Sequence, residues 1–169
     1  MSLNNLSKML TELGHRKEAL QAAQEAVALY RQLAQQHPNA FLPDLAMSLN
    51  NLGMVLTELG RREEALQATQ EAVQIRRQLA QQHPDVFLPN LAASLHNLGL
   101  VLAELGRREE ALQAAHEAVQ IRRQLAQQHP KAFLPDLARS VGLYGLVLMS
   151  LGRARKARAA FAEALQQIL

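Results

Sequence analysis

The sequence contains no cysteine and no tryptophan, and its 169 residues include only two tyrosines and four phenylalanines. The absence of cysteine excludes disulfides, zinc–thiolate sites and a cysteine nucleophile, and it favours a cytoplasmic protein. The few aromatic rings offer few platforms on which nucleic-acid bases could stack. These absences exclude several common kinds of functional site and predict no cofactor.

Long apolar runs are also missing. The longest, Val141–Met149, falls far short of the ~18 residues of a membrane span, and Met1–Gly14 has no signal-peptide core. The net charge is +3, but residues 1–139 hold 14 basic and 14 acidic side chains, so the excess lies at one end. A nucleic-acid binder normally has a broad basic face. We therefore expect neither a membrane nor a nucleic acid as partner.

The chain repeats itself every 46 residues. "LAQQHP" occurs three times, which places identical histidines at positions 37, 83 and 129, and glycines recur at 14, 60, 106 and 152. A fixed period in the range of about 20–50 residues indicates a repeat array. The sequence predicts one repeat domain over residues 1–169, as part of a longer array, with repeats at 1–47, 48–93, 94–139 and 140–169.

Each repeat predicts two helices. In the second copy, apolar residues at Leu45, Leu49, Leu52, Val55, Leu56 and Leu59 form one helical stripe. Gly60 then fits the left-handed position after a helix end. A second amphipathic helix follows until Pro84 stops it. With the next helix starting near Pro89, "HPDVF" is a connector and the two helices have about 17 and 20 residues.

This pattern resembles the tetratricopeptide repeat. The matching positions in the second copy are Leu49, Leu52, Gly53, Leu56, Gly60, Ala65 and Ala72. The unit is longer than usual, as in kinesin-light-chain-type repeats and the arrays of large bacterial signalling proteins. The resemblance implies an all-α, right-handed α-solenoid of four helix-turn-helix repeats with eight helices, whose first helices line a concave face. It implies protein or peptide partners and no enzymatic chemistry.

The repeated histidines are interpreted as structural. Equivalent positions in neighbouring repeats lie roughly 10 Å apart or more, whereas zinc binds ligand nitrogens at about 2.1 Å. His37, His83 and His129 therefore cannot share one ion, and no nucleophile accompanies them. "HEAVQ" at residues 116–120 also lacks the second histidine of a metalloprotease helix. We predict no catalytic and no metal-binding residues.

The resemblance assigns partner binding to the exposed face of the first helices. The predicted residues are Asn5, Lys8, Met47, Asn50, Asn51, Met54, His96, Asn97, Leu100 and Arg139. The amides of Asn5, Asn51 and Asn97 either bind the backbone of an extended peptide or hold neighbouring helices in register. Of five positions that grip chaperone C-termini in some family members, only Asn97 and Arg139 carry the required residue type, which disfavours that ligand.

The first helix of the last repeat is apolar on nearly all sides. We expect Leu143, Leu146 and Met149 to mark self-association or a core helix covered by a further segment, and Gly142 has no explanation. The sequence therefore supports a non-catalytic interaction scaffold. The alternative is a self-assembling or sensor segment of a larger bacterial signalling protein.

Overall fold

The computed structural model describes the backbone of residues 2–168 and the side chains of residues 2–166. Within that part of the chain there are eight α-helices and no strand, which confirms the all-helical prediction. The helices are α1 (Leu3–Glu12), α2 (Arg16–Gln36), α3 (Pro38–Glu58), α4 (Arg62–Gln82), α5 (Pro84–Glu104), α6 (Arg108–Gln128), α7 (Pro130–Ser150) and α8 (Ala154–Ile168).

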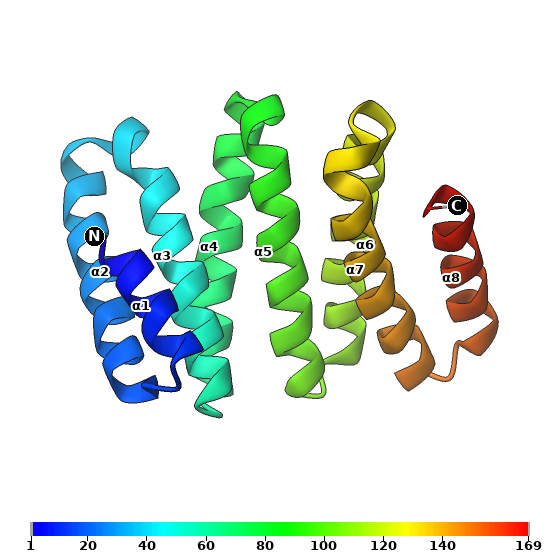
Figure 1. Cartoon of the computed structure of the whole chain (residues 1–169), viewed down its shortest axis with the longest axis horizontal. Coiled ribbons are helices and arrows are strands. Elements are labelled where there is room, and N and C mark those ends of the chain that lie inside the picture. The colour runs from blue at the N-terminus through cyan, green and yellow to red at the C-terminus, as the bar shows by residue number, and fades with distance from the viewer. Residues whose placement is uncertain (1, 169) are drawn as a thin grey trace. The chain divides into compact units, whose positions relative to one another are not determined.

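The helices form two compact units. Unit 1, Met1–His83, contains α1–α4, and unit 2, Pro84–Leu169, contains α5–α8. Inside each unit every helix packs against the next one along the chain, and α1 also contacts α3 as α5 contacts α7 (Figure 1). Each unit is therefore a pair of helical hairpins whose first helices lie next to each other.

A glycine ends the first helix of each hairpin. At Gly60 the backbone has φ of +73°, and the amides of Gly60 and Arg61 donate to the carbonyls of Thr57 and Leu56, both at 2.9 Å. A Cβ built on Gly60 would meet no atom within 4 Å. Glycine is therefore required by the left-handed conformation and not by lack of space, as the sequence predicted.

The connection between hairpins is a single residue. His37 separates α2 from α3 with φ of −137° and ψ of 73°. Its N–H donates to the Leu33 carbonyl at 2.8 Å, and its own carbonyl accepts from the amides of Ala40 and Phe41 at 3.2 Å. The predicted helix start near the second proline is wrong, because α3, α5 and α7 begin at Pro38, Pro84 and Pro130.

The early start gives each of these helices 21 residues, with a proline inside. Pro43 cannot donate the backbone hydrogen bond expected of its position, which is a cost. The additional helical turn places Phe41 and Leu42 against a core that includes Val27 and Ala34. Burial of these apolar side chains offsets the missing hydrogen bond.

Small residues bring the two helices of a hairpin together, as at Gly53. A Cβ at Gly53 would lie 2.6 Å from Thr69 Cγ2 and 3.5 Å from the Ala65 carbonyl oxygen. A Cβ at Gly145 would overlap the ring of Phe161. In both units the second helix therefore approaches within contact distance of the backbone of the first.

Two helices, α5 and α7, are long and apolar enough to cross a membrane when judged by length and composition alone. Both are packed inside unit 2, where Leu91, Leu95, Leu102, Leu137 and Leu148 are buried. Core helices of repeat proteins meet the same criteria, so this observation alone does not indicate a membrane span.

The Gly53 contact gives a test of the packing. Gly53→Ala should lower the free energy of unfolding, because overpacking costs about 1–3 kcal/mol. Thr69 cannot rotate away freely, since its hydroxyl donates to the Ala65 and Leu66 carbonyls at 2.9 and 3.1 Å. In a Thr69→Ala background the same change should be neutral or stabilising by up to ~1 kcal/mol, from improved helix propensity. Urea unfolding of the unmodified protein, the two single variants and the double variant measures whether the effect of Gly53→Ala changes sign. Equal effects of Gly53→Ala with Thr69 and with Ala at position 69 would contradict this explanation.

Candidate functional site

A groove lies between the first helices of the two hairpins in unit 1. Its volume is about 230 Å³, and the residues that line it are Ser7, Lys8 and Thr11 of α1 with Asn51, Met54 and Val55 of α3. Three of the residues predicted to bind a partner, Lys8, Asn51 and Met54, therefore come together at one cavity.

The polar groups of this groove differ in what they already bind. The Ser7 hydroxyl donates to the Ala19 carbonyl at 2.9 Å, and the Thr11 hydroxyl donates to the Ser7 carbonyl at 3.0 Å. The side chains of Lys8 and Asn51 form no hydrogen bond or ion pair with the described residues. One amide and one ammonium group are therefore available to a ligand, beside the half-exposed thioether of Met54.

The other predicted residues of unit 1 lie outside this groove. Asn5 and Met47 are exposed but do not line the cavity. Asn50 was expected on the exposed face and is instead buried, with only 8% of its surface exposed. It has an interaction partner of its own, so a structural role replaces the predicted contact with a partner protein.

In unit 2 the corresponding position is filled. Leu143 takes the place of Asn51 in the repeat and is buried, and a Cβ built on Gly99 would lie 3.1 Å from its Cδ2 atom. The predicted role of Leu143 in self-association is therefore wrong, because the side chain packs against α5. Leu146 and Met149 are exposed, at 64% and 57%. Gly142 has open space around its Cα, and packing does not explain it.

The polar residues predicted in unit 2 are His96, Asn97 and Arg139. Asn97 is half-buried and has no hydrogen-bond partner among the described residues. Leu100 is exposed on the same helix. Arg139 is exposed and pairs with Asp136 one turn earlier on α7. Neither the Asn51 nor the Asn97 amide therefore forms a hydrogen bond with the described residues that would hold neighbouring helices in register.

A buried arginine that the sequence analysis missed joins α6 to α7. Arg122 is only 5% exposed, and its Nη1 donates to the Asp136 carbonyl at 2.9 Å and the Ser140 hydroxyl at 2.6 Å. Burial lowers the pKa of its guanidinium. The signal for it was a difference between copies, because Tyr30 occupies the equivalent position in the first repeat.

His96 of α5 lies in the field of this arginine. Burial lowers the pKa of His96 to about 4, with further lowering by Arg122 and Arg139 and an opposing effect of Asp136. Its Nδ1 atom is buried without a hydrogen-bond partner. His96 is therefore neutral near pH 7.

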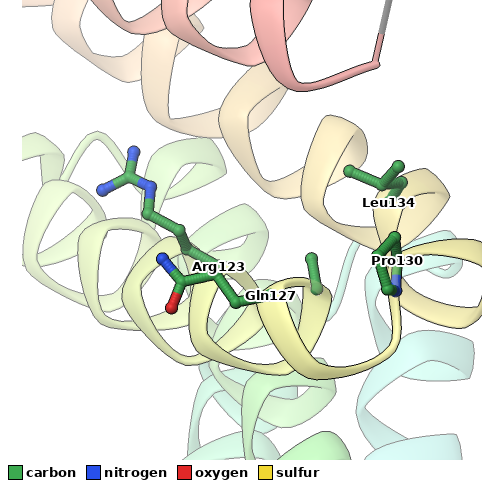
Figure 2. Close-up of a pocket in the computed structure, with 5 residues that line it drawn as sticks. Arg123, Gln127, Pro130 and Leu134 are labelled. Atoms are coloured by element: carbon green, nitrogen blue, oxygen red, sulfur yellow. The ribbon is translucent and has the colours of Figure 1, made fainter.

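Two further cavities lie in unit 2, between α6 and the helices that follow it. The smaller, of about 180 Å³, is formed by Arg123 and Gln127 extending from α6 with Pro130 and Leu134 at the start of α7 (Figure 2). The larger, of about 270 Å³, extends to α8 and includes Tyr144, whose ring centroid is 5.3 Å from that of His116. Arg123 and Glu163 form an ion pair of 3.0 Å, and Lys156, which also lines the larger cavity, takes no part in it.

The repeated histidines His37, His83 and His129 are exposed at helix ends. Across residues 2–166, no three side chains of His, Asp or Glu lie close enough together to hold a metal ion.

The hairpin geometry and the groove agree with the comparison of this sequence with known families. Sequence models described as tetratricopeptide repeat match residues 44–124 and residues 1–39. Together these matches cover well over half of the chain. The protein belongs to the tetratricopeptide repeat family, whose members are generally non-catalytic.

Solved structures with the same fold are distant in sequence. BtubC (BKLC) from P. vanneervenii matches over 98% of this chain and 61% of its own, with a TM-score of 0.79 and 20% identity. The nearly identical repeats of a putative kinesin light chain from Podospora anserina match 98% of this chain and 72% of that one, with a TM-score of 0.79 and 21% identity.

Aspartyl phosphate phosphatase F from Bacillus subtilis matches over 98% of this chain and 39% of its own, with a TM-score of 0.75 and 17% identity. At these identities the likenesses establish the fold alone, and the chain spans less than two thirds of BtubC. A search of curated protein sequences gave no significant match.

The low pKa of His96 predicts a pH dependence of stability. An unfolded histidine has a pKa near 6.5, so between about pH 6.5 and 4 the unfolded chain binds more protons than the folded one. Stability is therefore complete above pH 6.5 and falls as the pH approaches 4. We expect a loss of about 1–2 kcal/mol after allowing for partial exposure.

His96→Asn introduces the residue that the first two repeats carry at this position, Asn4 and Asn50, and should remove this part of the pH dependence. Urea unfolding followed at several pH values measures it. An unchanged difference between neutral and acid stability in the variant would show that other groups cause the effect.

Proposed function

We propose that this protein is a non-catalytic scaffold that binds an extended peptide segment of a partner protein in the groove between α1 and α3. The observation that carries the proposal is the conjunction of Asn51 and Lys8, both without partners, at a cavity of about 230 Å³. The family to which the chain belongs generally binds protein partners.

The chemistry of the groove matches a peptide backbone. An asparagine amide can both donate to a carbonyl and accept from an N–H, so it can bind one peptide unit in an extended segment. The Lys8 ammonium offers three donors to a carbonyl or carboxylate of the same ligand. Met54 supplies a flexible apolar surface that adapts to different side chains.

Other observations support a non-catalytic protein that acts on protein partners in the cytoplasm. Catalysis has no support in this groove, because its two hydroxyls donate to backbone carbonyls. The absence of cysteine supports a reducing compartment such as the cytoplasm. The balanced charge of residues 1–139 supports a protein partner over nucleic acid, and the packing of α5 and α7 within unit 2 supports action away from a membrane.

Asn51→Leu tests the groove, since leucine is the residue that the fourth repeat carries there. Peptides selected from a random phage-displayed library against the unmodified chain should lose about tenfold or more in affinity, because hydrogen bonds to the amide are lost. Fluorescence anisotropy of labelled peptides measures this.

Gln74→Leu is the matched control, because Gln74 is exposed on α4, away from the groove. The proposal is wrong if Asn51→Leu and Gln74→Leu leave affinity equally unchanged, with circular dichroism confirming that both variants are folded.

A second candidate function is self-assembly, supported by the exposed apolar side chains of Leu146 and Met149 on α7. Exposed apolar surface on a helix commonly marks association. If a second copy covers it, light scattering should show a dimer or larger species at micromolar concentration. Changing Leu146 and Met149 together to Glu should then give a monomer with unchanged helical content. A monomer at all concentrations in the unmodified protein excludes this function.

A further inference from the structure

The cavity of about 270 Å³ in unit 2 has walls from three helices. These walls include His116 and Arg123 of α6, Val141 and Tyr144 of α7, and Lys156 and Ala159 of α8. From this geometry we infer that the cavity binds a small planar aromatic acid, with the ring between the helices and the acidic group at the rim. The site is separate from the groove between α1 and α3 and goes beyond the proposed function.

Aromatic and small apolar side chains form the body of the cavity. The rings of His116 on α6 and Tyr144 on α7 have centroids 5.3 Å apart and are tilted by 37°, and the small side chains of Ala159 and Ala160 on α8 belong to the same wall. An apolar cavity of about 150 Å³ is large enough for benzene, so this cavity has room for a molecule of one or two rings. Aromatic rings attract a further ring in offset or edge-on arrangements, which favours a planar aromatic ligand over a saturated one.

The charged groups of the cavity leave one positive charge unpaired. Arg123 and Glu163 form an ion pair of 3.0 Å, so their charges offset each other. Lys156 has no ion pair or hydrogen bond with the described residues, and its ammonium group is therefore available to a negatively charged ligand. The Nε–H of Arg123 is buried without a hydrogen-bond acceptor, which costs free energy, so a small movement of this side chain towards a ligand oxygen would be favourable.

The equivalent place in unit 1 shows which of these features the fold itself requires. The ion pair is common to both units, since Arg31 and Glu71 pair at 2.9 Å at the positions of Arg123 and Glu163. The lining positions that differ, given as the unit 2 residue and then the unit 1 residue, are His116 and Gln24, Val141 and Leu49, Tyr144 and Leu52, Lys156 and Glu64, and Ala159 and Gln67. Unit 1 forms the same helical packing without the two rings and the lysine, so the fold does not require them.

The exchange of glutamate for lysine also changes the ion pairs at the start of α8. In α4 and α6 the glutamate at this position pairs with an arginine three residues earlier, as Glu110 does with Arg107. In α8 the equivalent arginine, Arg153, pairs instead with Glu109 of α6 at 2.7 Å. This pair ties α8 to α6, and it leaves Lys156 without a counter-charge among the described residues.

Packing holds the α8 wall of the cavity in place. Phe161 of α8 lies so close to Gly145 of α7 that a Cβ on this glycine would overlap the ring. The ion pair between Arg123 and Glu163 joins α8 to α6 at a second point, further along the helix than Arg153. Because the walls are already ordered, binding of a small ligand requires little further ordering of the chain.

The probe for this site is 2-naphthoate, a planar two-ring carboxylate, titrated into the full chain by isothermal calorimetry at about 20 mM salt, where screening is weak. Two matched compounds separate its features, because 2-naphthamide lacks the charge and decahydro-2-naphthoate lacks the aromatic rings. We expect 2-naphthoate to bind about fivefold more tightly than either compound, since it alone combines a charge for Lys156 with rings for Tyr144.

Two pairs of variants on α8 test the place of binding. Ala159→Gln introduces the residue that unit 1 carries and should weaken 2-naphthoate binding at least about tenfold, because the longer side chain occupies the cavity. Its control is Ala162→Gln, the same change at an exposed position that does not line the cavity. Lys156→Glu should weaken binding about fivefold at low salt, whereas Arg158→Glu, the same charge reversal at an exposed position outside the cavity, should have a much smaller effect.

Tyr144→Leu separates the aromatic contact from the charge. Leucine is the residue that unit 1 carries at this position, so the packing of α7 should be retained. The variant should bind 2-naphthoate and decahydro-2-naphthoate with affinities within about twofold of each other. It should still bind 2-naphthoate more tightly than 2-naphthamide, because Lys156 is unchanged.

Any one of four results would overturn the inference. These are the absence of 2-naphthoate binding at millimolar concentration, equal affinity for 2-naphthoate and either matched compound, equal effects of Ala159→Gln and Ala162→Gln, and equal effects of Lys156→Glu and Arg158→Glu. Circular dichroism checks that each variant is folded. If Ala159→Gln does not fold, the comparison of Lys156→Glu with Arg158→Glu still decides the question.

Asn51→Leu distinguishes this site from the proposed function, because it should leave 2-naphthoate binding unchanged. If Asn51→Leu weakens 2-naphthoate binding as much as Ala159→Gln does, the compound binds in the groove of unit 1 and the site in unit 2 is rejected. If Ala159→Gln abolishes 2-naphthoate binding but leaves the affinity for the selected peptides unchanged, the two sites are independent and the inference is supported whatever the outcome for the groove.

Discussion

The close approach of the two helices in each hairpin is the constraint on which the rest of this structure depends. The approach is possible because the first helix carries a small residue where the second helix comes nearest. In three hairpins this residue is glycine, as at Gly53 opposite Thr69 and Gly145 opposite Phe161. In the first hairpin it is Ser7, whose hydroxyl donates to the Ala19 carbonyl of α2. The side chain that faces the small residue differs between hairpins, since it is threonine opposite Gly53 and phenylalanine opposite Gly145. Interior packing of this density leaves no room for an additional methyl group unless the facing residue is replaced by a smaller one.

The same approach decides which residues remain open for binding. One side of each first helix packs against the second helix of its hairpin. Other sides face the neighbouring first helix of the same unit and the solvent. In unit 1 polar Asn51 leaves a cavity there, while in unit 2 apolar Leu143 fills the corresponding space against Gly99. Five of the six residues that line the groove are different at the equivalent positions of unit 2, and the exchange of Asn51 for Leu143 is one of them. The two units therefore present different chemistry on the same kind of helical hairpin.

Much of the fold followed from periodicity. The 46-residue repeat, the glycine turns and the close-packed positions Gly53 and Ala65 depend on local geometry and on spacing, which one sequence displays directly. The helix start did not follow, because both Pro38 and Pro43 are compatible with a helical beginning and only the burial of Phe41 and Leu42 selects the first. The sequence also did not predict that Asn50, Leu143 and Arg122 are buried. The burial of each side chain depends on the residue that a neighbouring helix places opposite it.

The junction at His37 has a consequence for how such a chain can change. A single residue, held by hydrogen bonds on both its N–H and its carbonyl, joins two helices of 21 residues. There is no surface loop at this junction that could absorb an inserted or deleted residue, and one extra residue would rotate the following helix by roughly 100° about its axis. Lengthening by whole 46-residue segments leaves every junction intact. The architecture therefore favours growth by duplication of complete repeats, after which single exchanges such as Asn to Leu give each copy its own surface.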